Sequence, residues 1–198
     1  MAQQIVELTC PGCGDRVTTG QTECKFCHKP IVISTFNSVY SMPMPEVNKY
    51  ANEYRKALSD NPDNKDLNTS IAMCYLKLKL YDKAQLAFEK AIENNFDSSE
   101  AFFYAAICLL KGNKAFLTQR PTIDKIEEYT NAALMIEPKG IYYYFWAYIK
   151  YDYFNRKFFN TTPTYQEALQ MSIDHGVTEF DKEQIFSILS VPQPDTLQ

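Results

Sequence analysis

Four cysteines near the start of the chain limit how its first residues can fold. They form two Cys-x2-Cys pairs: Cys10, Cys13, Cys24 and Cys27. Two such pairs can surround one tetrahedral metal ion, with each pair forming a tight turn whose sulfur atoms point at a common centre. Because four thiolates leave no coordination position vacant, the spacing predicts one structural Zn²⁺ ion. About 34 residues are too few to bury a stable core, and the metal would supply the missing folding free energy.

The residues inside and beside the two pairs agree with this interpretation. The segments Cys-Pro-Gly-Cys-Gly (10–14) and Cys-Lys-Phe-Cys-His (24–28) contain turn-forming residues, and residues 17–18 and 31–33 are typical of short strands. The module resembles the short zinc ribbons attached to many bacterial proteins. One alternative is a thiol redox sensor, in which the same pairs would act as labile dithiols.

Charge and hydropathy indicate the class of protein. The net charge of the 198-residue chain is −4, and residues 1–34 carry equal numbers of acidic and basic side chains, so we expect no broad nucleic-acid surface. We expect no secretory signal, because the first residues lack a basic segment followed by an apolar one. We also expect no membrane span and no membrane partner, because no apolar run approaches 18 residues. Cys74 and Cys108 stand alone in apolar helical patterns. Reduced thiols together with a four-cysteine metal site predict a cytoplasmic protein.

A 34-residue period begins after residue 46. Its clearest copy places small and large apolar residues on two successive helices: Ile71, Ala72, Tyr75, Ala84, Phe88 and Ala91. Small residues let two antiparallel helices approach closely, and the large ones fill the seam between them. The spacing resembles the tetratricopeptide repeat, a helix–turn–helix unit. The resemblance implies a mainly α protein, an α-α superhelix of about three helical pairs, in which Tyr50 stands where the family has a small residue.

These patterns divide the chain into four parts. We expect a zinc ribbon over 1–34, a proline-containing linker over 35–45, a tetratricopeptide-like helical domain over 46–190, and a flexible tail over 191–198. The last part of the helical domain contains an amphipathic segment with capping residues near Thr178 and Asp181. We expect this segment to be a helix that covers the apolar end of the repeat stack.

The resemblance also implies a partner site, because these repeats bind peptides along the concave face of their first helices. The positions expected to form that groove are Met73, Lys77, Phe103, Ile107, Leu110, Tyr142, Phe145 and Ile149. Most are apolar, which argues against a clamp for a peptide carboxylate and favours a hydrophobic peptide or an amphipathic helix. The alternative is that the C-terminal helix or another subunit already covers this face, because residues 142–146 are apolar all round.

The sequence contains no phosphate-binding glycine loop and no recognisable nucleophile–base set. We therefore predict a non-catalytic scaffold that binds a protein or peptide partner through its repeats. The alternative is a nucleic-acid-associated factor, in which the ribbon contacts DNA or RNA and the repeats recruit a protein.

Overall fold

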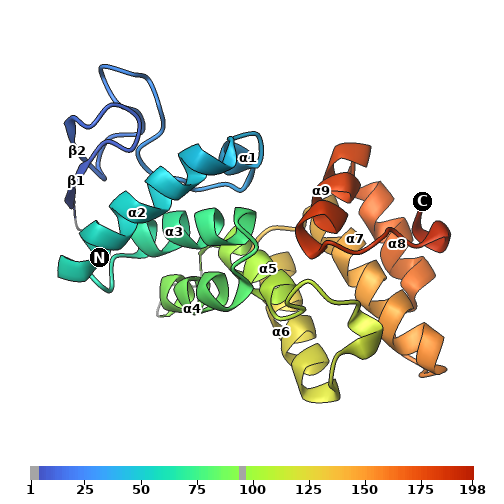
Figure 1. The fold of residues 1–198 in the computed structure, drawn as a ribbon. Helices are drawn as coiled ribbons and strands as arrows, with labels where there is room; N and C mark the ends of the chain where they lie inside the picture. Colours follow the sequence, from blue (N-terminus) through green and yellow to red (C-terminus); the bar gives the residue numbers. More distant parts are fainter. Residues whose placement is uncertain (1–4, 94–96) are drawn as a thin grey trace. The chain divides into compact units, whose positions relative to one another are not determined.

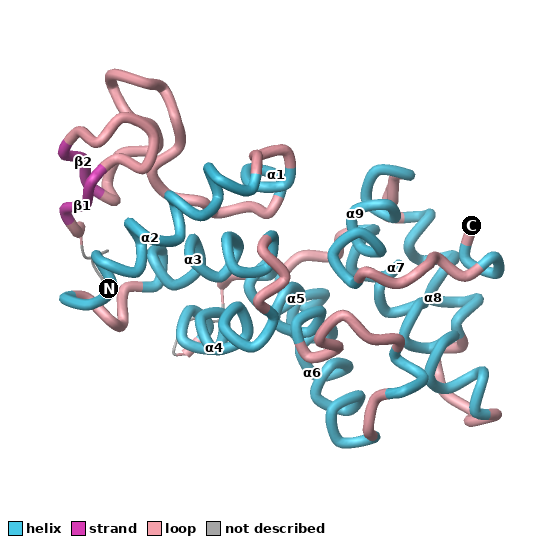
Figure 2. The backbone as a smooth tube through the Cα atoms, in the orientation of Figure 1, coloured by secondary structure: helices cyan, strands magenta, loops and turns pink. Residues whose placement is uncertain are grey.

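The computed structural model describes residues 5–93 and 97–198, so parts of the predicted ribbon (1–4) and repeats (94–96) lie outside the described residues. The described chain is mainly helical, with one small N-terminal sheet (Figures 1 and 2). This confirms the predicted mainly α fold with a small β module and tetratricopeptide-like helical pairs. The chain forms two compact units, Met1–Asn95 and Phe96–Gln198.

The sheet of the first unit is a short antiparallel pair, β1 (Glu7–Thr9) and β2 (Arg16–Thr18). Leu8 pairs with Val17, and both side chains are buried while their neighbours along the strands are more exposed. The predicted strand at 31–33 does not form, and this region has only an isolated bridge between Glu23 and Pro30. The backbone of Ile33 instead pairs with a helix side chain, as described below.

The described residues of the first unit also form four helices: α1 (Asn37–Tyr40), α2 (Met44–Asp60), α3 (Lys65–Lys77) and α4 (Tyr81–Ile92). Pro45 lies in the first turn of α2, where the missing N–H costs nothing. The Asn64 side chain caps α3 by accepting a hydrogen bond from the Leu67 N–H (3.0 Å). Residues 35–45, expected as a linker, contain α1 and bury Phe36 and Val39.

The second unit contains five α-helices among its described residues: α5 (Ser99–Cys108), α6 (Arg120–Ile136), α7 (Gly140–Ile149), α8 (Tyr165–Asp174) and α9 (Glu179–Leu189). Short helical turns connect or extend them: η1 (Ala115–Leu117), the π-turn η2 (Lys150–Phe154), η3 (Asn155–Lys157) and η4 (Asp195–Leu197). The pairs α3–α4, α5–α6 and α7–α8 pack as helical hairpins. Gly140, the first residue of α7, lets the backbone that follows α8 pack directly against it. A Cβ at this position would lie 2.4 Å from the Val177 backbone nitrogen.

The C-terminal helix α9 packs against α7. A capping box at Thr178 and Asp181 starts α9, and the rings of Tyr144 and Tyr148 on α7 meet Phe186 edge-on. Residues 191–198, expected as a flexible tail, contain η4 and bury Leu197. The buried hydroxyl of Tyr144 donates a hydrogen bond to the Leu197 carbonyl (2.7 Å), which fixes this segment on the second unit.

None of the described helices combines the length and the apolar composition that crossing a bilayer requires.

Candidate metal centre and repeat surfaces

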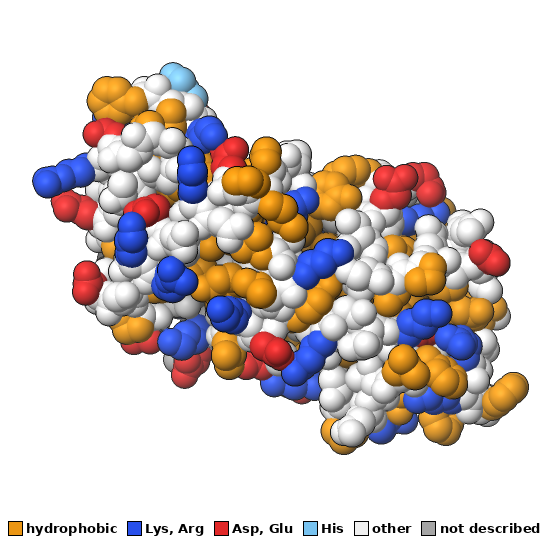
Figure 3. Space-filling model, in the orientation of Figure 1, with side chains coloured by type: hydrophobic (Ala, Val, Ile, Leu, Met, Phe, Trp, Pro, Cys, Tyr) orange, Lys and Arg blue, Asp and Glu red, His pale blue; other side chains and the backbone are white. Residues whose placement is uncertain are grey.

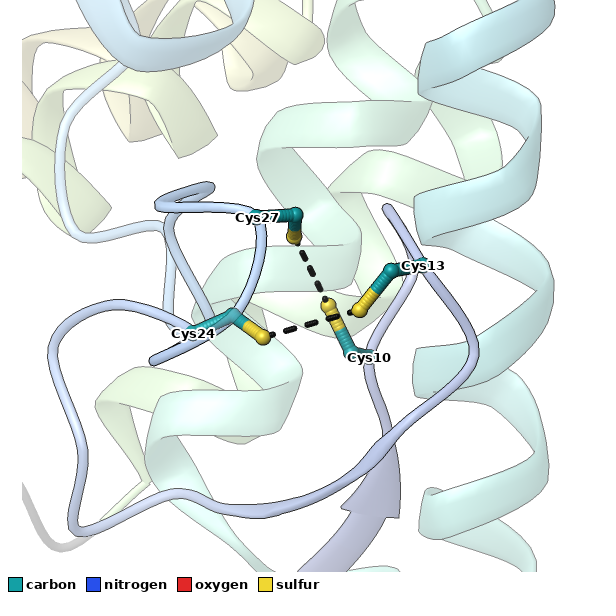
Figure 4. A group of neighbouring side chains, drawn as sticks. All are labelled: Cys10, Cys13, Cys24 and Cys27. Atoms are coloured by element: carbon teal, nitrogen blue, oxygen red, sulfur yellow. Dashed lines mark hydrogen bonds between the residues drawn. The ribbon is translucent and has the colours of Figure 1, made fainter.

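The four N-terminal cysteines come together as a compact cluster, in which every Sγ atom lies within 4.8 Å of the others (Figure 4). The sulfurs of Cys10 and Cys27 are 3.6 Å apart, as are those of Cys13 and Cys24. Around a tetrahedral Zn²⁺ with Zn–S bonds of about 2.3 Å, the sulfur atoms would be about 3.8 Å apart. The donor set and its spacing therefore fit one four-coordinate metal ion that prefers thiolates.

Two turns of matching geometry hold these cysteines. In the first turn, the Cys10 N–H donates to the Asp15 carbonyl (2.7 Å) and the Gly14 N–H donates to the Cys10 carbonyl (2.9 Å). The second turn repeats both bonds. Its Cys24 N–H reaches the Lys29 carbonyl and its His28 N–H reaches the Cys24 carbonyl, each at 2.9 Å. Each turn has a left-handed residue at the same place, Gly14 (φ 85°) and His28 (φ 56°). His28 thus serves a backbone role, which its side-chain chemistry did not indicate.

Backbone amides and neighbouring sulfurs act together on the pKa values of the cysteines, and the net direction differs from one cysteine to the next. Hydrogen bonds from the N–H groups of Cys27 and Phe26 lower the pKa of Cys24 to about 7. The N–H of Asp15 acts in the same direction on Cys13. Burial and the three other sulfurs outweigh it, and they raise the Cys13 pKa to about 12. Four thiolates therefore repel one another without a cation, and a divalent metal would supply the compensating charge.

The metal centre is fixed to helix α2 by side chains that follow one another at helical spacing. Lys29, two residues after Cys27, forms an ion pair with Glu46. The hydroxyl of Tyr50 donates to the Pro30 carbonyl (3.0 Å), and that of Tyr54 donates to the Ile31 carbonyl (2.7 Å). Sequence analysis did not indicate either of these hydrogen bonds. The one signal was the large Tyr50 at a position where the repeat family has a small residue.

The segment that follows the metal centre in the sequence packs on helix α3. The Ile33 N–H donates to Ser70 Oγ (2.9 Å), and the same hydroxyl donates back to the Ile33 carbonyl (3.3 Å). Further along α3, the Lys77 ammonium donates to the Tyr40 carbonyl and lies 4.7 Å from the centroid of the Tyr40 ring. Residues 33–40 therefore lie along α3, one of the helices expected to form the groove.

Most positions of the predicted groove lie in the interior of the helical pairs. Lys77 is partly exposed, whereas these seven are buried: Met73, Phe103, Ile107, Leu110, Tyr142, Phe145 and Ile149. In the second unit Phe103 is the centre of an aromatic cluster, with its ring centroid 4.4 Å from that of Tyr142 and 5.7 Å from that of Phe145. A partner could reach these rings only if the helices moved apart.

Comparison with known proteins relates part of the helical region to a family of helical repeats. Residues 51–113 match the family described as Tetratricopeptide repeat. The cysteine cluster and its two short strands are consistent with a zinc ribbon fused to these repeats. No curated protein matches the chain.

Proposed function

We propose that this protein is a non-catalytic scaffold that holds a protein partner through its helical repeats. The observation that carries the proposal is the tetratricopeptide match at residues 51–113, on a chain whose helices pack as hairpins. Tetratricopeptide repeats commonly mediate contacts between proteins. Seven of the eight predicted groove residues are buried, so their contribution in this proposal is indirect. These buried residues pack the helices against one another, and the exposed helix faces and connecting loops contact the partner.

The scaffold proposal has a direct test in native purification of the intact chain from its own cells, followed by mass spectrometry and chemical cross-linking. We expect one protein to be enriched in a fixed ratio to the bait, with cross-links to residues of the repeats. Nuclease treatment should leave this capture unchanged. Loss of the partner after nuclease treatment would instead support the nucleic-acid alternative, and turnover of a substrate by the purified chain would contradict the non-catalytic assignment.

We further propose that the cysteine cluster holds one structural Zn²⁺ in a reducing compartment, the cytoplasm. The support is chemical, since four thiolates at tetrahedral spacing suit Zn²⁺ and leave no position for a substrate. The bound ion would lock together the two turns that begin at Cys10 and Cys24. Its role in this proposal is to add folding free energy, and the cluster carries out no reaction.

The zinc assignment predicts one equivalent of Zn²⁺ per chain in elemental analysis of the natively purified protein. Replacing the ion with Co²⁺ should give the absorption bands of tetrahedral thiolate coordination, because the donor set is four sulfurs. A thiol-reactive probe should label Cys10, Cys13, Cys24 and Cys27 only after the metal is removed. Labelling of all four thiols with zinc still bound, or disulfides within each pair, would favour the redox alternative.

A further inference from the structure

Two connecting segments meet at one end of the second unit: residues 112–121, which lead from α5 into the start of α6, and residues 155–163, which lead from η2 to α8. The Phe116 N–H donates to Oδ2 of Asp152 (2.8 Å), and the Arg156 guanidinium lies 4.5 Å from the centroid of the Phe116 ring. Lys157 lies 5.0 Å from the same centroid. The two loops therefore form one surface, here called the loop patch, made of Lys114, Leu117, Arg120, Arg156, Lys157, Phe158 and Phe159.

The loop patch exposes large apolar side chains. Phe158 is 94% exposed, Leu117 is 72% exposed and Phe159 is 49% exposed. A single exposed apolar residue is ordinary on a protein surface, but three on two touching loops are a patch of the kind that marks an interaction site. Figure 3 shows hydrophobic and basic side chains next to one another over this end of the unit.

The backbone of Phe158 strengthens this interpretation. Phe158 ends η3 in the left-handed conformation, with φ 59° and ψ 30°. Glycine or asparagine is the stable choice at such a position, and a bulky side chain there is an outlier. A polar side chain at this exposed position would also favour solubility of the protein. Neither backbone stability nor solubility accounts for an exposed phenylalanine here, so its side chain has another role.

Charge is concentrated at the same place. Residues 96–198 contain nine basic and thirteen acidic side chains, and thus have a formal charge of −4. Six of the nine basic residues lie within 111–120 and 150–157, whereas these two segments contain one acidic residue, Asp152. Asp152 is buried and paired with Arg156. Arg120 is paired with Asp124, and Lys150 is buried and paired with Glu127. The positive charge that the loop patch presents outward therefore rests mainly on Lys114 and Lys157, on a unit that is otherwise acidic.

We propose that the loop patch docks this protein on the surface of an anionic lipid bilayer. The apolar side chains belong to exposed loops, and a bilayer interface accepts such side chains without a matching cavity. Arg156 and Lys157 lie over the rings of Phe116 and Tyr153, at the base of the loops, where they would meet lipid phosphates once Phe158 enters the interface. Acidic side chains elsewhere on the unit would be repelled and so fix its orientation. The contact is peripheral and needs no membrane-spanning helix, so it departs from the expectation of no membrane partner, which rested on the lack of a spanning apolar run.

The test is co-sedimentation of the full, metal-replete chain with vesicles. We expect binding to equal mixtures of phosphatidylglycerol and phosphatidylcholine, much weaker binding to phosphatidylcholine alone, and release as salt concentration rises. Phe158→Asn should weaken binding about tenfold or more, because the anchor is lost. Its unfolding midpoint should stay the same or rise, since asparagine suits the left-handed conformation. The double variant Lys114→Gln/Lys157→Gln should weaken binding to the anionic vesicles and leave the weak binding to phosphatidylcholine vesicles unchanged.

The matched control is Met135→Asn. Met135 is 88% exposed and lies on α6, about 22 Å along the helix from Arg120, so it removes an exposed apolar residue outside the loop patch. This variant should bind anionic vesicles like the unmodified chain. Equal binding of the Phe158→Asn variant, or no binding by the unmodified chain, would refute the proposal. Two other occupants give distinct results that would also overturn it. If the occupant is a protein partner, a photo-cross-linker placed at Leu117 would yield protein adducts. If it is a second copy of this chain, light scattering would show a dimer, and Phe158→Asn would dissociate it.

Discussion

Replacing Cys10 with serine is expected to unfold the metal module and to loosen helix α2 with it. The variant lacks one of four thiolates, and it should lose a large part of the roughly 10–16 kcal/mol that structural zinc supplies in small modules. The effect should extend beyond the cysteines, because the carbonyls of Pro30 and Ile31 accept hydrogen bonds from Tyr50 and Tyr54 on α2. Hydrogen exchange should therefore speed up in residues 5–60, and a chelator should have the same effect on the unmodified chain.

The matched control for this prediction is Cys74→Ala. Cys74 is a buried cysteine of the same unit that lies on α3, outside the cluster. Its loss should leave the metal content unchanged and cost only the contacts of one small buried side chain. If Cys10→Ser retained a full equivalent of metal and normal hydrogen exchange in α2, the metal centre would not be what fixes the N-terminal residues on the helices.

Phe103→Ala is expected to destabilise the second unit by about 3–5 kcal/mol. Phe103 is buried, and its ring contacts those of Tyr104, Tyr142 and Phe145, so truncation would leave a cavity between α5 and α7. Denaturant titration followed by circular dichroism would measure the change. A residue of an open binding groove would behave differently, since its truncation would reduce partner binding with little effect on stability.

Met135→Ala serves as the control in that experiment. Its side chain is exposed on the same unit, and the substitution should change the free energy of unfolding by no more than about 0.5 kcal/mol. If Phe103→Ala proved as harmless as this control, Phe103 would have to be accessible in solution, and the groove predicted from the repeat resemblance would regain support.

The sequence alone was sufficient for the features that depend on local spacing. The cysteine cluster could be predicted because each Cys-x2-Cys pair forms its own turn. The helical hairpins could be predicted because small and large residues recur at a fixed period, as at Ala72, Ala84 and Phe88. Both patterns depend on residues that are neighbours along the chain or in adjacent helices, so their geometry follows from the sequence directly.

The features that escaped sequence analysis depend on contacts between distant residues. Nothing in the sequence near Ile33 indicates that its backbone pairs with Ser70, 37 residues later. The same holds for the tail, whose Leu197 carbonyl accepts a hydrogen bond from Tyr144. The groove was predicted from family positions, but whether such positions face solvent depends on what packs over them. Here residues 33–40 lie along α3 and α9 packs on α7.

The segment 33–40 connects metal binding to the accessibility of α3. It follows directly from the cysteine module and is anchored on α3 at Ser70 and Lys77. A ligand that needed the bare face of α3 would have to displace this segment and disturb its attachment to the cysteine module. Such a ligand and the metal would therefore oppose each other, and thermodynamic reciprocity requires each to weaken the other's affinity by the same factor. Depletion of the metal would then expose the face of α3 along which residues 33–40 lie.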